Sequence, residues 1–200
     1  EALIIASLFG SKFTLQLLAQ VLAKNDKDLH AILWPAVVQH LIIPQKVNYK
    51  YVPDFYDEKG IDIPFKFAHD KLQQALYFQV KADEKQQLHY KIGKLLLNQN
   101  NPEKIFKIAN HFIIAKDETL TQGSNKQIEQ FLLTAGKHSF SAASFESAFR
   151  YLDLYIKLAD KETIYTEDYC LYLEASLITG ELPTLDEQIN FALNGAKGIL

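Results

Sequence analysis

The alternation of apolar and polar residues changes period within one short stretch, residues 65–77. Phe65 and Phe67 alternate with Lys66, which is the period of a half-buried strand. The apolar residues Leu72 and Leu76 then follow at helical spacing. The stretch therefore predicts a strand that passes directly into a helix.

The junction between this strand and helix carries His69 and Asp70. Asp70 is a good helix N-cap, because its side-chain oxygen can accept from a free backbone N–H in the first turn. Gln73, three residues later, completes a pattern like a capping box. We therefore expect Asp70 to cap the helix and His69 to lie between strand and helix.

Residues 1–47 show three short apolar patterns of helical period. They predict helices Leu3–Phe9, ended by Gly10; Leu15–Ala23, capped by Thr14; and Asp28–Leu41, kinked or split by Pro35. Ile42, Ile43 and Val47 predict a strand, and Pro44 restricts it to the edge of a sheet.

Residues 48–64 are rich in aromatic residues and also contain glycine and proline, which is typical of a long hairpin tip. Three helices, a strand, such a tip (the wing) and a returning strand make up a winged-helix-like domain. We assign residues 1–80 to this domain.

The pattern after Tyr77 is helical throughout. It predicts helices beginning near Asp83, Pro102, Ser124, Phe145, Thr166 and Thr184. Ser124 with Gln127 has the spacing of a capping box, Gly180 ends the helix Thr166–Thr179, and Lys116–Gly123 is expected to be a loop.

The last four of these helices form two expected helix hairpins. The second members of the hairpins begin at Phe145 and Leu185, an offset of 40 residues. That offset suits a helical-pair repeat somewhat longer than the roughly 34 residues of the TPR consensus. We therefore expect a mainly α protein, with TPR-like antiparallel helical pairs over residues 81–200 that continue beyond Leu200.

The charge balance argues against a nucleic-acid partner. The net charge is −3, the pI is near 6.1, and Arg150 is the one arginine among 21 basic residues. The expected helix Asp28–Leu41, which would enter a DNA groove in a winged helix, has no lysine or arginine. We expect no nucleic-acid binding.

Other sequence features concern the compartment. The longest apolar run, 31–38, is far shorter than the roughly 20 residues of a membrane span, so no membrane partner is expected. Cys170 is the single cysteine, which fits the reducing cytoplasm, and we expect it to be a small buried residue.

The chain begins at Glu1 and has no methionine, which indicates an excerpt of a longer polypeptide.

The sequence lacks the common motifs for catalysis and metal binding. The sequence has no Gly-x-x-x-x-Gly-Lys-Ser/Thr phosphate loop, no Cys-x-x-Cys, no His-Glu-x-x-His and no Gly-x-Ser-x-Gly. His89 and His111 lie on helices whose apolar faces account for them, and His30 and His40 are too far apart for one metal site. We expect no catalytic residue and no metal site in this chain.

Several motifs, in order, resemble one protein family. The stretch 65–77, Phe-x-Phe-x-His-Asp-x-x-Gln-Gln-Ala-x-Tyr, is similar to the end of the winged helix in STAND-class signalling ATPases of bacteria. Leu88-His89-x-x-Ile92-Gly93, residues 105–111 and Ala135-Gly136-Lys137 resemble later parts of the same family. The family usually has Arg and Ala where this chain has Lys71 and Leu76.

The resemblance implies a non-catalytic regulatory segment of an ATPase, in a protein that also carries kinase or other sensor parts. It implies that His69 senses the β-phosphate of ADP and that Asp70 supports it, with ADP or ATP held only in the full-length protein. The implied partners are a nucleotide-binding domain of the same chain and a protein or ligand effector on the helical repeats.

Two alternatives remain open. Asp70 can cap its helix while His69 only packs and hydrogen-bonds locally. The chain as a whole can be a free-standing interaction scaffold that holds a peptide on the concave face of its helical pairs.

Overall fold

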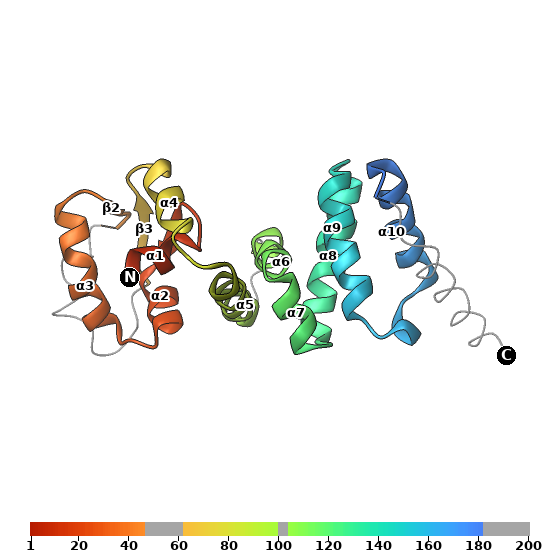
Figure 1. Cartoon of the computed structure of the whole chain (residues 1–200), viewed down its shortest axis with the longest axis horizontal. Helices are drawn as coiled ribbons and strands as arrows, with labels where there is room; N and C mark the ends of the chain where they lie inside the picture. Colours follow the sequence, from red (N-terminus) through yellow and green to blue (C-terminus); the bar gives the residue numbers. More distant parts are fainter. Residues whose placement is uncertain (47–61, 100–103, 182–200) are drawn as a thin grey trace. The chain divides into compact units, whose positions relative to one another are not determined.

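The computed structural model describes residues 1–46, 62–99 and 104–181 (Figure 1). The chain is mainly helical, with a small antiparallel sheet of three strands. Its internal contacts divide it into two compact units, unit 1 (Glu1–Leu95) and unit 2 (Leu96–Leu200). This division lies inside a helix, α5, and the expected domain boundary at residue 80 stays a prediction.

Unit 1 contains the sheet and the helices around it. Its elements are α1 (Ala2–Ser7), β1 (Lys12–Thr14), α2 (Leu15–Leu22), α3 (Asp26–Val38), β2 (Ile42–Pro44), β3 (Pro64–Phe67), α4 (Asp70–Tyr77) and most of α5 (Ala82–Asn98). The strand order is β1-β3-β2, and β3 is antiparallel to both neighbours. As predicted, the strand with Pro44 lies at an edge of the sheet.

The caps of α2 and α3 follow from local side chains. The Thr14 hydroxyl accepts from the Leu17 N–H at 3.4 Å, as predicted. Helix α3 begins two residues earlier than expected, because the Asn25 side chain accepts from the Asp28 N–H at 2.7 Å. Pro35 lies inside α3 without dividing it in two. The expected wing lies almost entirely in residues 47–61, outside the described residues.

Three phenylalanines form the centre of the unit 1 core. Phe65 and Phe67 on β3 are fully buried, whereas Lys66 between them is exposed, as the alternation predicts. The Phe13 ring of β1 stacks on Phe65 at 5.5 Å between centroids and lies 5.5 Å from Phe67. One face of the sheet thus carries the buried phenylalanines, and the other face exposes Lys12, Lys66 and Ile43.

The described part of unit 2 consists of helices that pack on one another. They are α6 (Ile105–Ile114), α7 (Lys116–Gln122), α8 (Lys126–Ser141), α9 (Phe145–Leu158), the 3-10 turn η3 (Lys161–Thr163) and α10 (Thr166–Thr179). Helices α8 and α9 form a hairpin, and α10 packs on α9 (Figure 1). The expected helix from Thr184 lies outside the described residues.

Two local predictions in unit 2 are wrong. Residues 116–122 form helix α7 instead of a loop: Asp117 and Glu118 lie in its first turn, where carboxylates are favourable, and Thr119 is fully buried. The cap of α8 is Asn125, whose side chain accepts from the N–H groups of Gln127 and Ile128, and not Ser124. The prediction that Gly180 ends α10 is confirmed, with φ of +76°.

No helix of the described ranges is both long and apolar enough to cross a membrane.

Gly136 permits the close approach of α8 and α9. A Cβ atom at this position would lie 2.7 Å from both Cγ and Cδ2 of Leu152, a fully buried side chain on α9. This separation is well below van der Waals contact, so the hairpin requires a residue without a side chain here unless Leu152 moves.

We therefore expect Gly136→Ala to lower the free energy of unfolding by about 1–3 kcal/mol, the usual cost of overpacking a core. In a Leu152→Ala background the clash is gone, and the same change should be neutral or stabilising by up to about 1 kcal/mol, because alanine favours helix over glycine. Urea denaturation of the four proteins measures both values. An equal loss in both backgrounds would contradict the packing argument.

Candidate functional site

The strand-to-helix junction of unit 1 positions His69 and Asp70. The strand before it is fixed on both sides: the Phe67 N–H donates to the Ser11 carbonyl and the Ala68 N–H to the Leu41 carbonyl, each at 3.0 Å. The backbone is therefore anchored up to the residue before His69.

Helix α4 begins at Asp70, and the N-cap is His69. The His69 backbone is extended, with φ −136° and ψ 134°, and its carbonyl accepts from the N–H groups of Leu72 and Gln73. The prediction that Asp70 caps this helix is wrong by one residue; its carboxylate lies in the first turn, where the helix dipole favours a negative charge. The Gln73 amide is used elsewhere, donating to the Ser7 carbonyl at 2.7 Å and joining α4 to α1.

The side chains of His69 and Asp70 are both exposed. Among the described residues, neither side chain makes a hydrogen bond or ion pair, so Asp70 does not hold the His69 ring. For the alternative in which His69 packs and hydrogen-bonds locally, no side-chain hydrogen bond of His69 is seen among the described residues, and its packing stays a prediction. An exposed imidazole on an anchored backbone can donate to a group outside unit 1.

A pair of lysines near this junction was not predicted from the sequence. Lys12 on β1 and Lys66 on β3 are opposite each other across the sheet, on its exposed face. Like charges in this position repel each other, and an anion beside them would reduce that repulsion. The alternation of apolar and polar residues in each strand indicates that both lysines are exposed. It does not show that they are neighbours, because this depends on the register between two strands whose paired residues, Lys12 and Lys66, are 54 positions apart in the chain.

His89 is buried in unit 1 beside the half-buried Tyr77 and Lys85, and it is not part of the exposed site. It is 2% exposed, its Nε2 lies 3.4 Å from the Tyr77 hydroxyl, and the Lys85 ammonium lies 4.2 Å from the centre of the Tyr77 ring. Burial, with a smaller contribution from the positive charge of Lys85, lowers the pKa of His89 from 6.5 to about 4. The ring is thus neutral at pH 7, in keeping with the packing role predicted for it.

Cys170 and His111 are two further residues whose side chains could take part in a site. Cys170 is exposed, so the prediction that it is buried is wrong; the buried residues of α10 fall on other positions of the helix, such as Tyr169 and Tyr172. His111 is buried in α6, as a packing role implies. Within residues 1–46, 62–99 and 104–181, no group of three or more His, Cys, Asp and Glu side chains could hold a metal ion.

No protein-family model, curated protein or solved structure matches this chain.

The lowered pKa of His89 makes unit 1 sensitive to acid. The unfolded chain takes up a proton at His89 near pH 6.5, whereas the folded protein resists it until about pH 4. The contribution of His89 to the free energy of unfolding is fully present above pH 6.5. It falls by about 2 kcal/mol between pH 7 and pH 5. In urea denaturation, His89→Gln should remove this part of the pH dependence.

The matched control is His138→Gln, which changes an exposed histidine of α8 and should keep the full pH dependence. If the free energy of unfolding falls by the same amount between pH 7 and pH 5 in the wild-type protein and in His89→Gln, the buried neutral imidazole does not cause the loss of stability in acid.

Proposed function

We propose that this chain is a non-catalytic regulatory segment of a STAND-type ATPase, with a winged helix in unit 1 and TPR-like helical pairs in unit 2. The observation that carries the proposal is the exposed His69 at the end of a strand paired on both sides. In the family that the sequence resembles, a His-Asp pair at this junction senses the β-phosphate of ADP.

The order of elements in unit 1 supports the winged-helix part of the proposal. Helices α1, α2 and α3, the strand β2 and the returning strand β3 follow in the order of that fold, and β3 lies between β1 and β2. In unit 2, the α8–α9 hairpin with α10 packed on α9 is the arrangement that antiparallel helical pairs require.

The proposed mechanism is a switch controlled by nucleotide. His69 donates a hydrogen bond to a phosphate oxygen of ADP held by a nucleotide-binding domain of the same chain, while Lys66 and Lys12 add positive charge on the neighbouring sheet face. The bound ADP stabilises the closed arrangement. An effector on unit 2, or exchange of ADP for ATP, favours the open one through different contacts in the two states.

The outward side of α3 supports a protein partner over DNA. Ile32, Trp34 and Val38 are exposed there by 46%, 42% and 58%. Because α3 begins at Asp26, it includes one basic residue, Lys27, beside two acidic ones. A largely apolar, weakly charged helix suits packing against a protein domain better than contact with phosphates.

The direct test is nucleotide binding by a longer chain that includes the preceding domain. His69→Ala should weaken ADP binding about tenfold, the cost of one hydrogen bond to a charged group, and should raise basal output. Calorimetry measures the affinity, and His138→Ala is the matched control because it removes an exposed histidine of unit 2.

Unchanged ADP affinity together with unchanged basal output in His69→Ala would overturn the sensor role. If the longer chain binds neither ADP nor ATP, the interaction scaffold becomes the better interpretation of the whole segment.

The lysine pair gives a second prediction. Lys66→Gln should weaken ADP binding by the longer chain about threefold to fivefold at low salt, and the difference should shrink at high salt, because salt screens exposed charges. Lys27→Gln on α3 is the control for loss of one positive charge. Equal effects of the two substitutions would show that Lys66 acts only through net charge.

A further inference from the structure

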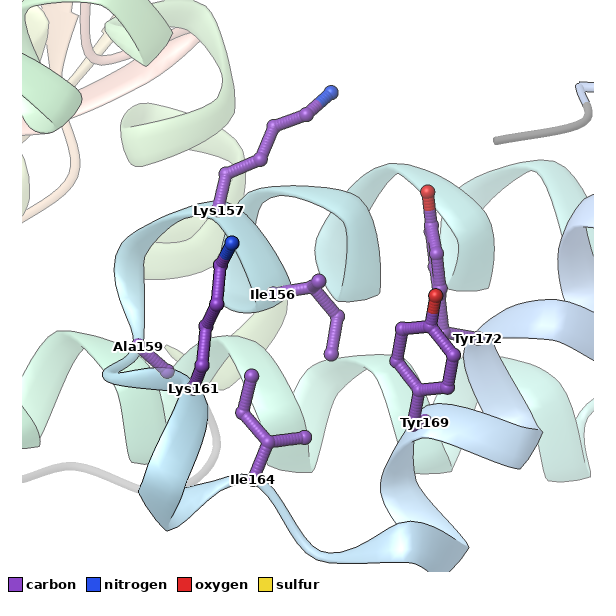
Figure 2. A pocket seen from close by; sticks show the side chains of 7 residues that line it. All are labelled: Ile156, Lys157, Ala159, Lys161, Ile164, Tyr169 and Tyr172. Carbon is purple, nitrogen blue, oxygen red and sulfur yellow. The ribbon is translucent and has the colours of Figure 1, made fainter. Parts of the chain in front are cut away.

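A pocket in unit 2 lies where the end of α9, the turn η3 and the start of α10 come together (Figure 2). Its volume is about 260 Å³, which suits a molecule of small size. It is lined by Ile156, Lys157, Ala159, Lys161, Ile164, Tyr169 and Tyr172. The pocket lies entirely within one unit, on residues that the structure describes.

One part of the lining is apolar and held in place by packing. Ile156 and Ile164 lie between the lysines and the tyrosines in Figure 2. The Tyr169 and Tyr172 side chains are 6% and 4% exposed, and Tyr172 is stacked on Phe149 at 5.7 Å between ring centres. Because these rings are fixed by their neighbours, the pocket requires little reorganisation to accept an apolar group.

The other part of the lining is positively charged. The Lys157 ammonium lies 2.6 Å from the Asp153 carboxylate, which also accepts from Lys116 at 2.9 Å. Two cations therefore share one anion and leave one positive charge in excess. Lys161 makes no ion pair with any described residue, and no carboxylate lines the pocket.

The polar ends of the lining side chains point the same way. In Figure 2 the ammonium groups of Lys157 and Lys161 and the hydroxyls of Tyr169 and Tyr172 are all directed toward the upper side of the view. A ligand whose anionic end faces these groups would place the rest of its body against Ile156 and Ile164. The Lys161 ammonium can donate to a carboxylate oxygen.

We propose that unit 2 binds a small organic carboxylate with a compact apolar or aromatic body in this pocket. A phosphate group is less suited, because the lining offers no arginine for a bidentate contact. The proposal goes beyond the ATPase role and does not depend on it. All residues that line the pocket lie in unit 2, and the test needs no nucleotide.

The probe is 3-phenylpropionate, titrated into the 200-residue chain and followed through isoleucine methyl signals in NMR spectra. We expect the methyl signals of Ile156 and Ile164 to shift in a saturable way. 3-Phenylpropanol, which has the same body without the charge, should bind about fivefold more weakly. Shifts confined to other isoleucines, or equal affinity for acid and alcohol, would overturn the proposal.

Two pairs of variants locate the charged and apolar contacts. Lys161→Gln should weaken binding of 3-phenylpropionate about fivefold, whereas Lys71→Gln, an exposed lysine of unit 1, should leave it unchanged. Ile164→Gln should weaken the acid and the alcohol alike by about tenfold, whereas Ile113→Gln on α6 should weaken neither. Thermal melting verifies that each variant is folded.

Affinity that is unchanged in both Lys161→Gln and Ile164→Gln would also overturn the proposal, since any binding that remained would then lie elsewhere.

Discussion

The central position of β3 is the constraint on which unit 1 depends. This strand of four residues pairs with β1 on one side and β2 on the other, and its two phenylalanines fill the core beneath the sheet. Strands β1 and β2 have three residues each, so neither would be stable without it. The same strand fixes the position of His69, because only Ala68 and His69 lie between the end of β3 at Phe67 and the start of α4 at Asp70.

Unit 2 follows a different principle, in which buried carboxylates are each paired with lysine. Glu129, Asp153 and Asp168 are at most 8% exposed, and each accepts from at least one lysine ammonium. Burying a charge is costly unless it is paired, and removing one partner leaves the other unpaired in the interior. The acidic residues of unit 2 are therefore part of its packing. Lys161, together with the excess of lysine around Asp153, gives the proposed carboxylate pocket its positive charge.

The sequence predicted those features that depend on neighbours in the chain. The alternation of Phe65, Lys66 and Phe67, the cap by Thr14 and the end of α10 at Gly180 all rest on local geometry and are confirmed. The two capping-box errors have a common origin, because one side chain of each expected box is used in another contact. Gln73 donates to Ser7 of α1 instead of completing a capping box, and Ser124 donates to the buried Glu129.

In the candidate site, too, the sequence predicted what depends on neighbouring residues and not what depends on distant parts of the chain. The sequence placed His69 at the junction of a strand and a helix, where the structure has it. It did not show that Lys12 and Lys66 are opposite each other, because this depends on strand register. The pocket of unit 2 was also missed, since it combines an isoleucine of α9, a loop isoleucine and two tyrosines of α10 that share no local pattern.

Helix α7 gives unit 2 a region of low local stability. Seven residues are too few for a stable helix in isolation, so α7 depends on the Lys116–Asp153 ion pair, half exposed on the lysine side, and on the buried Thr119. Opening α7 would break its packing on α6 and α9 and its ion pair with Asp153, but not the contacts between α8 and α9. Its backbone amides should therefore exchange with solvent deuterium long before those of α8 and α9, through a local opening far less costly than global unfolding.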